Sequence, residues 1–308
     1  MLEPLKATEA AVEAPLLFET GEARQEINLD YAATTPALRA TIEAVTEFLP
    51  SYGSVHRGGG RRSALSTEAY EAARESVAAF VGCSPEHSVI FVRNTTEAAN
   101  VLAAALPRAS RVLCSPFEHH ANLLPWRSHD VHYLPFTRSG LELVDAVDEE
   151  LARAKTSGAG YGLVAISGAS NVTGEITPLA ELARVARTHG ALIFVDGAQL
   201  VPHRPIELQN LDVDFLAFSG HKLYAPFGTG ALIARADELR DGLPLLRGGG
   251  AVRLVSLDDV AWSDLPHRFE AGTPNTVGAI ALGAACRALA EYGMDRIASA
   301  EHTLAVQL

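Results

Sequence analysis

Residues 215–223 read FLAFSGHKL, which places a lysine four residues beyond an apolar run. The run 215–218 is typical of a buried β-strand, so Lys222 is expected just past the end of that strand. An amine in such a place is partly desolvated, and desolvation favours the neutral form that attacks carbonyl groups. Taken alone, a lysine here is more often a solvated loop residue. Its role therefore depends on what folds around it.

Other polar side chains also follow short apolar runs. The segments 94–96 (NTT), 115–122 (SPFEHHAN) and 167–174 (SGASNVTG) each follow one, and Asp196 and Gln199 follow another. In open α/β sheets, ligands bind at the carboxyl ends of the strands. We therefore expect one crevice to collect a carboxylate, an amide, a lysine, histidines and hydroxyls.

Pyridoxal phosphate is a cofactor that needs this set. Its aldehyde forms a Schiff base with a lysine, and its ring acts as an electron sink while a carboxylate keeps the ring nitrogen protonated. Its phosphate suits the hydroxyls and N–H groups at a helix start, which Thr95 and Thr96 would supply. Asp196 could otherwise be a helix cap or a ribose ligand, but Gln199, three residues later, favours the pyridinium role.

The elements that must position these residues alternate along the chain. Helices are expected at 67–81, 97–106, 141–155, 179–189 and 277–308, the last with a possible break at Gly293. Short apolar strands are expected at 89–92, 111–114, 131–134, 163–166, 192–195, 215–218 and 231–234. The alternation predicts an α/β fold with three layers, in which helices cover both faces of a mostly parallel, seven-stranded sheet.

Residues typical of helix starts and ends support the predicted helix boundaries. Asn94 stands three residues before Glu97, directly after a strand, which is a capping pattern. Pro178 suits a first helical turn, and Gly190 suits a helix end.

Composition narrows the possible partners. The 308 residues are 48% hydrophobic and carry a net charge of −12, which disfavours binding to nucleic acids or anionic membranes. Arg57 to Arg62 is locally basic but short.

No apolar run is long enough to span a membrane, and the N-terminal residues do not resemble a secretory signal. Three widely spaced cysteines, Cys83, Cys114 and Cys286, favour a reducing cytoplasm over a disulfide framework.

At these motifs the sequence resembles a known family: class V aminotransferase-fold enzymes that use pyridoxal phosphate, in particular group II cysteine desulfurases and selenocysteine lyases. The matching segments run in family order from about residue 27 to the end of the chain. They are INLDYAATTP, SVHRGGGRRSALSTEAYE, VIFVRNTTEAANVLA, EHHANLLPW, ISGASNVTGEITPLAELA, FVDGAQLVPH, DFLAFSGHKLYAPFGTGAL and HRFEAGTPNT.

The resemblance implies three catalytic residues. Lys222 would be the Schiff-base lysine and the proton carrier at the α-carbon of the substrate. Asp196 would pair with the pyridinium nitrogen. His119 would stack on the ring and assist acid–base steps.

The same resemblance implies further cofactor contacts. Gln199 would bond the phenolic oxygen of the ring, and Asn171 would lie over the cofactor near the substrate carboxylate. Thr273 would reach the phosphate of a neighbouring subunit, which implies a homodimer with shared active sites. The phosphate would be held by Thr95 or Thr96 together with Ser219 and His221.

The expected organisation is an N-terminal arm at 1–26, a pyridoxal-phosphate-binding large domain at 27–280, and at 281–308 the start of a helix leading to an absent small C-terminal domain. In the desulfurases that domain carries a substrate-binding arginine and a loop cysteine, and the resemblance supplies neither here. Residues 57–64 also lack the histidine common in desulfurases. We expect the chain to be cut within its last helical element.

We expect a cytoplasmic enzyme that acts on an amino acid and is similar to the cysteine desulfurases. It would cleave a C–S bond through an external aldimine, and a sulfur-acceptor protein is a possible partner. A class V aminotransferase or epimerase on another amino acid is one alternative. A truncated, non-catalytic pyridoxal-phosphate-binding or dimerisation module is another. The histidines at 119–120, 129 and 132 could suggest zinc, but no metal is expected. The glycine runs at 58–60 and 248–250 fit mobile loops better than phosphate cradles.

Overall fold

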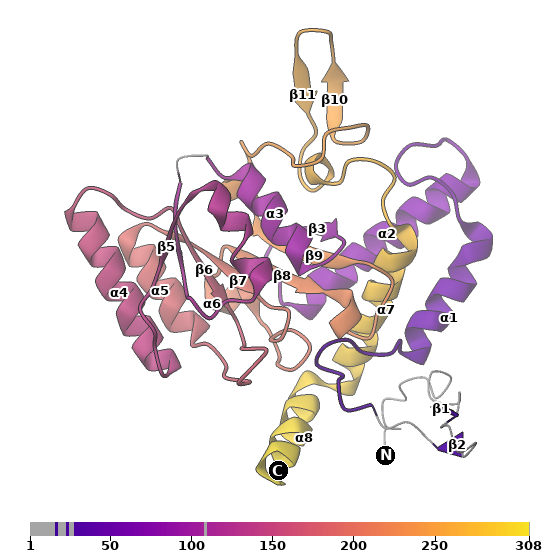
Figure 1. The fold of residues 1–308 in the computed structure, drawn as a ribbon. Coiled ribbons are helices and arrows are strands. Elements are labelled where there is room, and N and C mark those ends of the chain that lie inside the picture. The colour runs from indigo at the N-terminus through magenta and orange to yellow at the C-terminus, as the bar shows by residue number, and fades with distance from the viewer. Residues whose placement is uncertain (1–15, 18–22, 25–27, 108–109, 308) are drawn as a thin grey trace. The chain divides into compact units, whose positions relative to one another are not determined.

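The computed structural model describes residues 16–17, 23–24, 28–107 and 110–307 (Figure 1). The chain divides into two compact units. The sheet unit comprises Ala78–Ser219 and Gly230–Pro274, and the terminal unit comprises Met1–Val77, Gly220–Thr229 and Asn275–Leu308. The predicted arm at 1–26 lies mostly outside the described residues, which here include only the short strands β1 (Leu16–Leu17) and β2 (Ala23–Arg24).

Seven described strands of the sheet unit form one sheet in the order β3-β9-β8-β7-β6-β4-β5. All neighbouring pairs are parallel except those of β9, which runs antiparallel to both β3 and β8. The fold class predicted from the sequence, α/β with a mostly parallel seven-stranded sheet, is confirmed. The strands are β3 (His87–Val92), β4 (Arg111–Cys114), β5 (Asp130–Tyr133), β6 (Leu163–Ser167), β7 (Leu192–Asp196), β8 (Phe215–Ser219) and β9 (Gly230–Arg235).

The central strands β6, β7 and β8 are buried along nearly their whole length. Phe194, Phe215 and Trp126 are almost completely buried in one apolar cluster, and the Trp126 and Phe194 rings meet edge to face with centroids 5.4 Å apart. Burying large aromatic side chains in this way is a main source of core stability. This packing fixes where the strand ends lie.

Two of the predicted capping signals, Asn94 and Gly190, are confirmed, while Pro178 precedes the first turn of α5 as its N-cap residue. Asn94 caps α3, its Oδ1 accepting the Glu97 N–H at 2.9 Å. Gly190 ends α5 in the left-handed region at φ 77°. The helices of this unit are α3 (Thr95–Ala105), α4 (Gly140–Thr156), α5 (Leu179–His189) and α6 (Leu208–Leu211).

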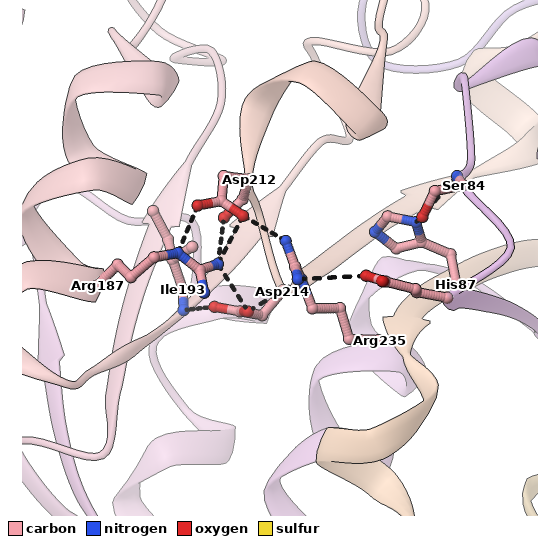
Figure 2. A network of polar contacts seen from close by, with 8 residues as sticks. Ser84, His87, Arg187, Ile193, Asp212, Asp214 and Arg235 are labelled. Atoms are coloured by element: carbon pink, nitrogen blue, oxygen red, sulfur yellow. Dashed lines mark hydrogen bonds and ion pairs between the residues drawn. The ribbon is translucent and has the colours of Figure 1, made fainter.

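Charged side chains tie the amino ends of β7 and β8 to neighbouring elements (Figure 2). The buried Asp214 accepts the Ile193 N–H at 2.8 Å and faces Arg187 and Arg235 at 3.6 and 3.3 Å. Both arginines also pair with Asp212. Burial raises the pKa of Asp214 although the arginines oppose that change. The network therefore joins the amino ends of these strands, whereas the sequence motifs follow their carboxyl ends.

Apart from β1 and β2, the regular elements described in the terminal unit are helices. α7 is apolar around most of its circumference, as a fully enclosed helix is, and Gly283 on it lies so close to Ala73 that an added Cβ would meet the Ala73 Cα at 2.8 Å. Gly293 separates α7 from α8, at the predicted break. The helices are α1 (Arg39–Phe48), α2 (Arg61–Phe80, which extends into the sheet unit), α7 (Thr276–Tyr292) and α8 (Met294–Gln307).

Several described elements were not predicted, among them α1 and the hairpin of β10 (Val252–Val255) and β11 (Val260–Trp262). The hairpin loop has no Asn-Gly or Asp-Gly signal, and its turn is instead held by the Ser256 hydroxyl, which accepts the N–H groups of Asp258 and Asp259.

Candidate active site

The carboxyl end of β8 is joined to the start of α3 by two hydroxyl groups. The Ser219 Oγ accepts the Thr95 N–H at 2.9 Å and lies 2.8 Å from the Thr95 Oγ1, and both side chains are buried. Thr96, the next residue, is exposed in the first turn of the helix. Thr95 therefore positions Ser219, while Thr96 is the threonine open to an anion at this helix start.

Asp196 ends β7, the strand next to β8, and its side chain is 4% exposed. Its Oδ1 accepts the Ala198 N–H at 3.0 Å, which shapes the turn that follows. Gln199 lies in that turn and is half-buried. The local hydrogen bond resembles the capping alternative considered from the sequence, but a carboxylate this deeply buried is also suited to pair with a cation.

A second buried carboxyl, missed by the sequence reasoning, lies at the same edge of the sheet. Glu118 follows β4 and is 7% exposed. Its Oε2 accepts hydrogen bonds from the Ser167 hydroxyl and from the Asn122 side chain, the latter at 2.6 Å. Burial, with a small contribution from the charge of Asp196, raises the pKa of Glu118 to about 7, although the hydrogen bonds from Ser167 and Asn122 oppose that change.

The remaining predicted residues of the sheet unit lie on exposed loops. His119 follows Glu118, is exposed, and accepts the Ala121 N–H through Nδ1 at 3.1 Å. Asn171 is exposed in the turn after β6, and Thr273 is exposed in the segment before α7. The structure thus places His119 and Asn171 just past strand ends, as predicted, with their side chains facing solvent.

Lys222 belongs to the terminal unit and ends a 3₁₀ turn, Gly220–Lys222, that follows β8 directly. It is half-buried. The backbone carbonyl of its neighbour His221 accepts the Thr35 N–H at 2.9 Å and the Thr35 hydroxyl at 3.0 Å. Burial and the charge of Lys222 lower the pKa of His221. Thr35 lies in the INLDYAATTP motif, so one purpose of that motif is to hold the lysine turn.

The other end of this loop is held by Asn275. Its Nδ2 donates to the carbonyls of Phe227 and Gly228 and to the Thr229 hydroxyl, at 2.8–3.1 Å. Its Oδ1 meanwhile caps α7 by accepting the Gly278 N–H at 3.0 Å. Asn275 is the asparagine of the EAGTPNT motif, and sequence reasoning had singled out only the threonine of that motif, Thr273.

These residues fit pyridoxal phosphate. A helix start with hydroxyls suits the phosphate, a buried carboxylate suits the protonated ring nitrogen, and a lysine held in an ordered turn suits the aldehyde. The carboxylate and the hydroxyls lie at the carboxyl ends of adjacent strands, β7 and β8, and the lysine turn continues from β8.

The aminotransferase class-V family matches residues 27–308. The chain belongs to this family. Because class V aminotransferases depend on pyridoxal phosphate, the chain is a pyridoxal-phosphate-dependent enzyme of the type I fold.

Curated relatives of this class V chain are named cysteine desulfurases. It is 39% identical over 303 residues to a probable cysteine desulfurase of Halalkalibacterium halodurans, and equally to a cysteine desulfurase of Klebsiella pneumoniae. Each alignment covers 94% of this chain and 73% of the relative.

Solved structures give the same result. The apo cysteine desulfurase of Thermococcus onnurineus NA1 matches with a TM-score of 0.80 and 34% identity, over 90% of this chain and 70% of that one. The cysteine desulfurase CsdA of Escherichia coli matches with a TM-score of 0.75 and 37% identity, over 86% and 68%. This class V chain is therefore cysteine desulfurase-like in sequence and fold.

Possible metal ligands, a cavity and the described helices of this class V chain add no residue to the candidate site. The described residues contain no group of three or more histidine, cysteine or acidic side chains placed to hold a metal ion. All three cysteines are free thiols, and burial raises the pKa of each. A cavity of about 1570 Å³ includes Leu106 and Leu192 in its lining but none of the predicted site residues. Among the described helices, none is both long and apolar enough to cross a bilayer.

Proposed function

We propose that this class V enzyme acts on an amino acid in the manner of its desulfurase relatives, removing the sulfur of cysteine. The observation that carries the proposal is the meeting of β7 and β8. One strand ends in the buried Asp196, and the other ends in the Thr95–Ser219 hydroxyl pair and continues into the Lys222 turn. The choice of cysteine as the substrate is supported by the relatives, which are named cysteine desulfurases.

Each residue then has a specific task. Bound pyridoxal phosphate supplies an aldehyde for amines and a ring that withdraws electrons from the substrate. Lys222 holds the cofactor at its amine and moves the proton of the substrate α-carbon. Asp196 keeps the ring nitrogen protonated, Gln199 donates to the phenolic oxygen, and His119 covers the ring.

The phosphate and carboxylate contacts complete the proposal. Thr96 with Ser219 and His221 binds the phosphate, and Thr95 keeps Ser219 in place. Asn171 orients the carboxylate of the substrate from the turn after β6. The side chain exposure of Thr96 and Asn171 leaves both able to meet a ligand.

The test is product analysis with purified protein, pyridoxal phosphate and single amino acids. Release of sulfide and alanine from cysteine, with a thiol reductant as acceptor, supports desulfuration. A keto acid would identify an aminotransferase and inverted stereochemistry an epimerase. Cofactor binding without any turnover would identify a binding or dimerisation module. Each of these three outcomes contradicts the desulfurase proposal.

We further propose a homodimer with shared sites, in the cytoplasm, that passes sulfur to an acceptor protein. The exposed Thr273 supports the shared site, because a second copy can reach a side chain that its own subunit leaves uncovered. The three free thiols support a reducing compartment. Faster cysteine turnover on adding a thiol-bearing protein, measured as alanine, would identify an acceptor.

A further inference from the structure

We propose that Glu118 is a positioning residue for His119. Its buried carboxyl closes the turn 118–122 and ties that turn to the end of β6, which holds His119 where it covers the cofactor ring. The inference rests on the proposed contact of His119 with the ring. It goes further because it gives a role to a buried acid that the proposed chemistry leaves unused.

His119 depends on its own turn for its position. Its side chain is exposed, and it precedes the 3₁₀ turn His120–Asn122 as the N-cap residue. The His119 Nδ1 accepts the Ala121 N–H at 3.1 Å, and the His119 carbonyl accepts the Asn122 N–H at 2.7 Å. The centroid of its ring lies 5.9 Å from that of His120, which is exposed too. Since these contacts all lie within the turn, the imidazole is only as well placed as the turn itself.

One oxygen of Glu118 closes this turn. The Glu118 Oε2 accepts a hydrogen bond from the Asn122 side chain at 2.6 Å, so the residues at the two ends of 118–122 are bonded to each other. The same oxygen accepts the Ser167 hydroxyl. Because Ser167 ends β6, the turn is attached to the sheet as well as closed on itself. Glu118 and Asn122 are both buried, so water cannot readily replace the bond between them.

The last residue of the turn is fixed in the core. The Asn122 Oδ1 accepts the Trp126 indole N–H at 2.9 Å, and Trp126 is completely buried in the apolar cluster that includes Phe194 of β7. A shift of the turn would break hydrogen bonds among buried groups, and a buried donor left unpaired is costly. A buried network in which each member is paired holds one arrangement. We therefore expect the turn to keep one conformation while Glu118 is present.

The end of β6 that holds this turn lies beside the strand that carries Asp196. Ser167 and Asp196 are register partners on the parallel strands β6 and β7, so their side chains leave the same face of the sheet. The Gly168 N–H also donates to the Asp196 carbonyl at 2.8 Å. Through Ser167, Glu118 thus sets the position of the His119 turn relative to the residue proposed to meet the ring nitrogen.

Glu118 serves this turn as a hydrogen-bond acceptor, and its charge is not required. Burial is the main cause of its raised pKa, so the ionised form is disfavoured at this position. Both donors reach the same oxygen of its side chain. The single carbonyl oxygen of a glutamine could accept from both, whereas alanine would leave Asn122 and Ser167 without this acceptor. Glu118→Gln should therefore keep the His119 turn in place, and Glu118→Ala should release it.

The experiment uses pyridoxine 5′-phosphate, which has the ring and phosphate of the cofactor but no aldehyde, so that Lys222 chemistry does not contribute. Its dissociation constant is measured calorimetrically for the wild type, for Glu118→Ala, Glu118→Gln and His119→Ala, and for the double variant Glu118→Ala/His119→Ala. We expect Glu118→Ala and His119→Ala each to bind roughly fivefold more weakly than the wild type, the scale of one lost ring contact. Glu118→Gln should bind within about twofold of the wild type, because it keeps the acceptor.

The double variant separates positioning from general destabilisation. If Glu118 acts through His119, removing both side chains should weaken binding no more than removing His119 alone, because the two effects share one contact. Glu150→Ala is the matched control. It removes a carboxyl of α4 that accepts the Tyr161 hydroxyl at 2.6 Å, near the amino end of β6. It should lower the free energy of unfolding without changing the affinity for pyridoxine 5′-phosphate.

Two further measurements apply if Glu118→Ala does not fold. Ser167→Ala removes only the bond to β6, so it should weaken binding by itself and have no effect when added to His119→Ala. Hydrogen exchange of the Ala121 amide, which donates to His119, reports on the turn in the protein without cofactor. This exchange should be faster in Ser167→Ala than in the wild type and unchanged in Glu118→Gln.

Losses that multiply in the double variant would overturn the inference, and so would wild-type affinity in both Glu118→Ala and Ser167→Ala. A Glu118→Gln variant that binds as weakly as Glu118→Ala would overturn it too. Wild-type affinity in His119→Ala, or a wild type that does not bind pyridoxine 5′-phosphate, would instead overturn the proposed cofactor contacts. The exchange of the Ala121 amide would then still show whether Glu118 holds the turn, so the two failures are distinguishable.

Discussion

Lys222 carries the proposed chemistry, and its environment explains why a lysine is usable there. The turn that holds it follows a buried strand directly, and the Thr35 hydrogen bonds to the His221 carbonyl fix the adjacent backbone. An amine on an ordered turn loses less conformational freedom on forming a bond than one on a solvated loop.

Replacing that amine should abolish cofactor attachment. Lys222→Ala incubated with pyridoxal phosphate and then dialysed should lose the yellow absorbance of the lysine adduct, and borohydride should no longer fix the cofactor covalently. Lys155→Ala is the matched control, because Lys155 is an exposed residue of α4 whose Nζ donates to the Thr188 carbonyl. A variant without Lys222 that stays yellow after dialysis would contradict the assignment.

Glu118 should also affect the pH dependence of stability. Its pKa is about 7 in the folded protein, against the ordinary glutamate value of 4.5, so the folded state holds a proton that the unfolded state has lost between those limits. The free energy of unfolding should therefore fall as pH rises from about 4.5 to about 7, by on the order of 3 kcal/mol, and then level off.

Urea unfolding of the protein without cofactor tests this. The free energy of unfolding of Glu118→Gln, relative to that of the wild type, should be higher at about pH 8 than at about pH 5. The wild type loses stability when Glu118 ionises, and glutamine cannot ionise. An identical difference at both values would mean that Glu118 does not titrate in this range.

Sequence reasoning found the residues with a chemical signature and missed those defined by their surroundings. Lys222 and Asp196 were predicted because each follows an apolar run. Glu118 was not, because a glutamate before two histidines gives no sign that Ser167, almost fifty positions later, will bond to it. Such a residue becomes visible only when the register of β4, β6 and β7 is known.

At the level of elements, the start of α3 can be separated into a structural and an electrostatic part. Asn94→Ala removes the cap and should lower the free energy of unfolding by about 1 kcal/mol. Asn94→Asp keeps the acceptor and should restore most of that stability. Its negative charge, however, stands where a phosphate would bind, so its affinity for pyridoxine 5′-phosphate should be lower than that of the wild type.

Unfolding in urea and calorimetric binding measure the two parts independently. If Asn94→Asp bound pyridoxine 5′-phosphate as tightly as the wild type, the phosphate would not lie at this helix start. If Asn94→Ala unfolded like the wild type, the hydrogen bond to Glu97 would contribute nothing to stability.

The elements themselves were largely predictable, for an identifiable reason. The seven strands are short, and the central ones are buried on both faces and read as continuous apolar runs, whereas the edge strand β5 is not buried. The observed ends of all seven lie within two residues of the predicted ones. The β10–β11 hairpin and α1 were missed because neither has a strong signal of its own. The antiparallel direction of β9 was also outside the prediction, since no local pattern encodes strand direction.

At the scale of the whole molecule, a shared site can be tested by mixing two defective chains. If Thr273 of one subunit serves the site that contains Lys222 of the other, Lys222→Ala and Thr273→Ala should each fail to retain pyridoxal phosphate as a lysine adduct. A mixed dimer would then rebuild one intact site, from Lys222 of one chain and Thr273 of the other. Random pairing should restore about a quarter of the wild-type absorbance per subunit.

The decisive control pairs Lys222→Ala with Asp196→Asn. Both residues would belong to the same subunit's share of the site, so mixing these two chains leaves every site with one defect, and no absorbance should return. Recovery in the first mixture but not in the second requires that the site be built from two chains. Recovery in neither, with dimers verified by light scattering, would place Thr273 outside the partner's site and leave each subunit to bind its cofactor alone.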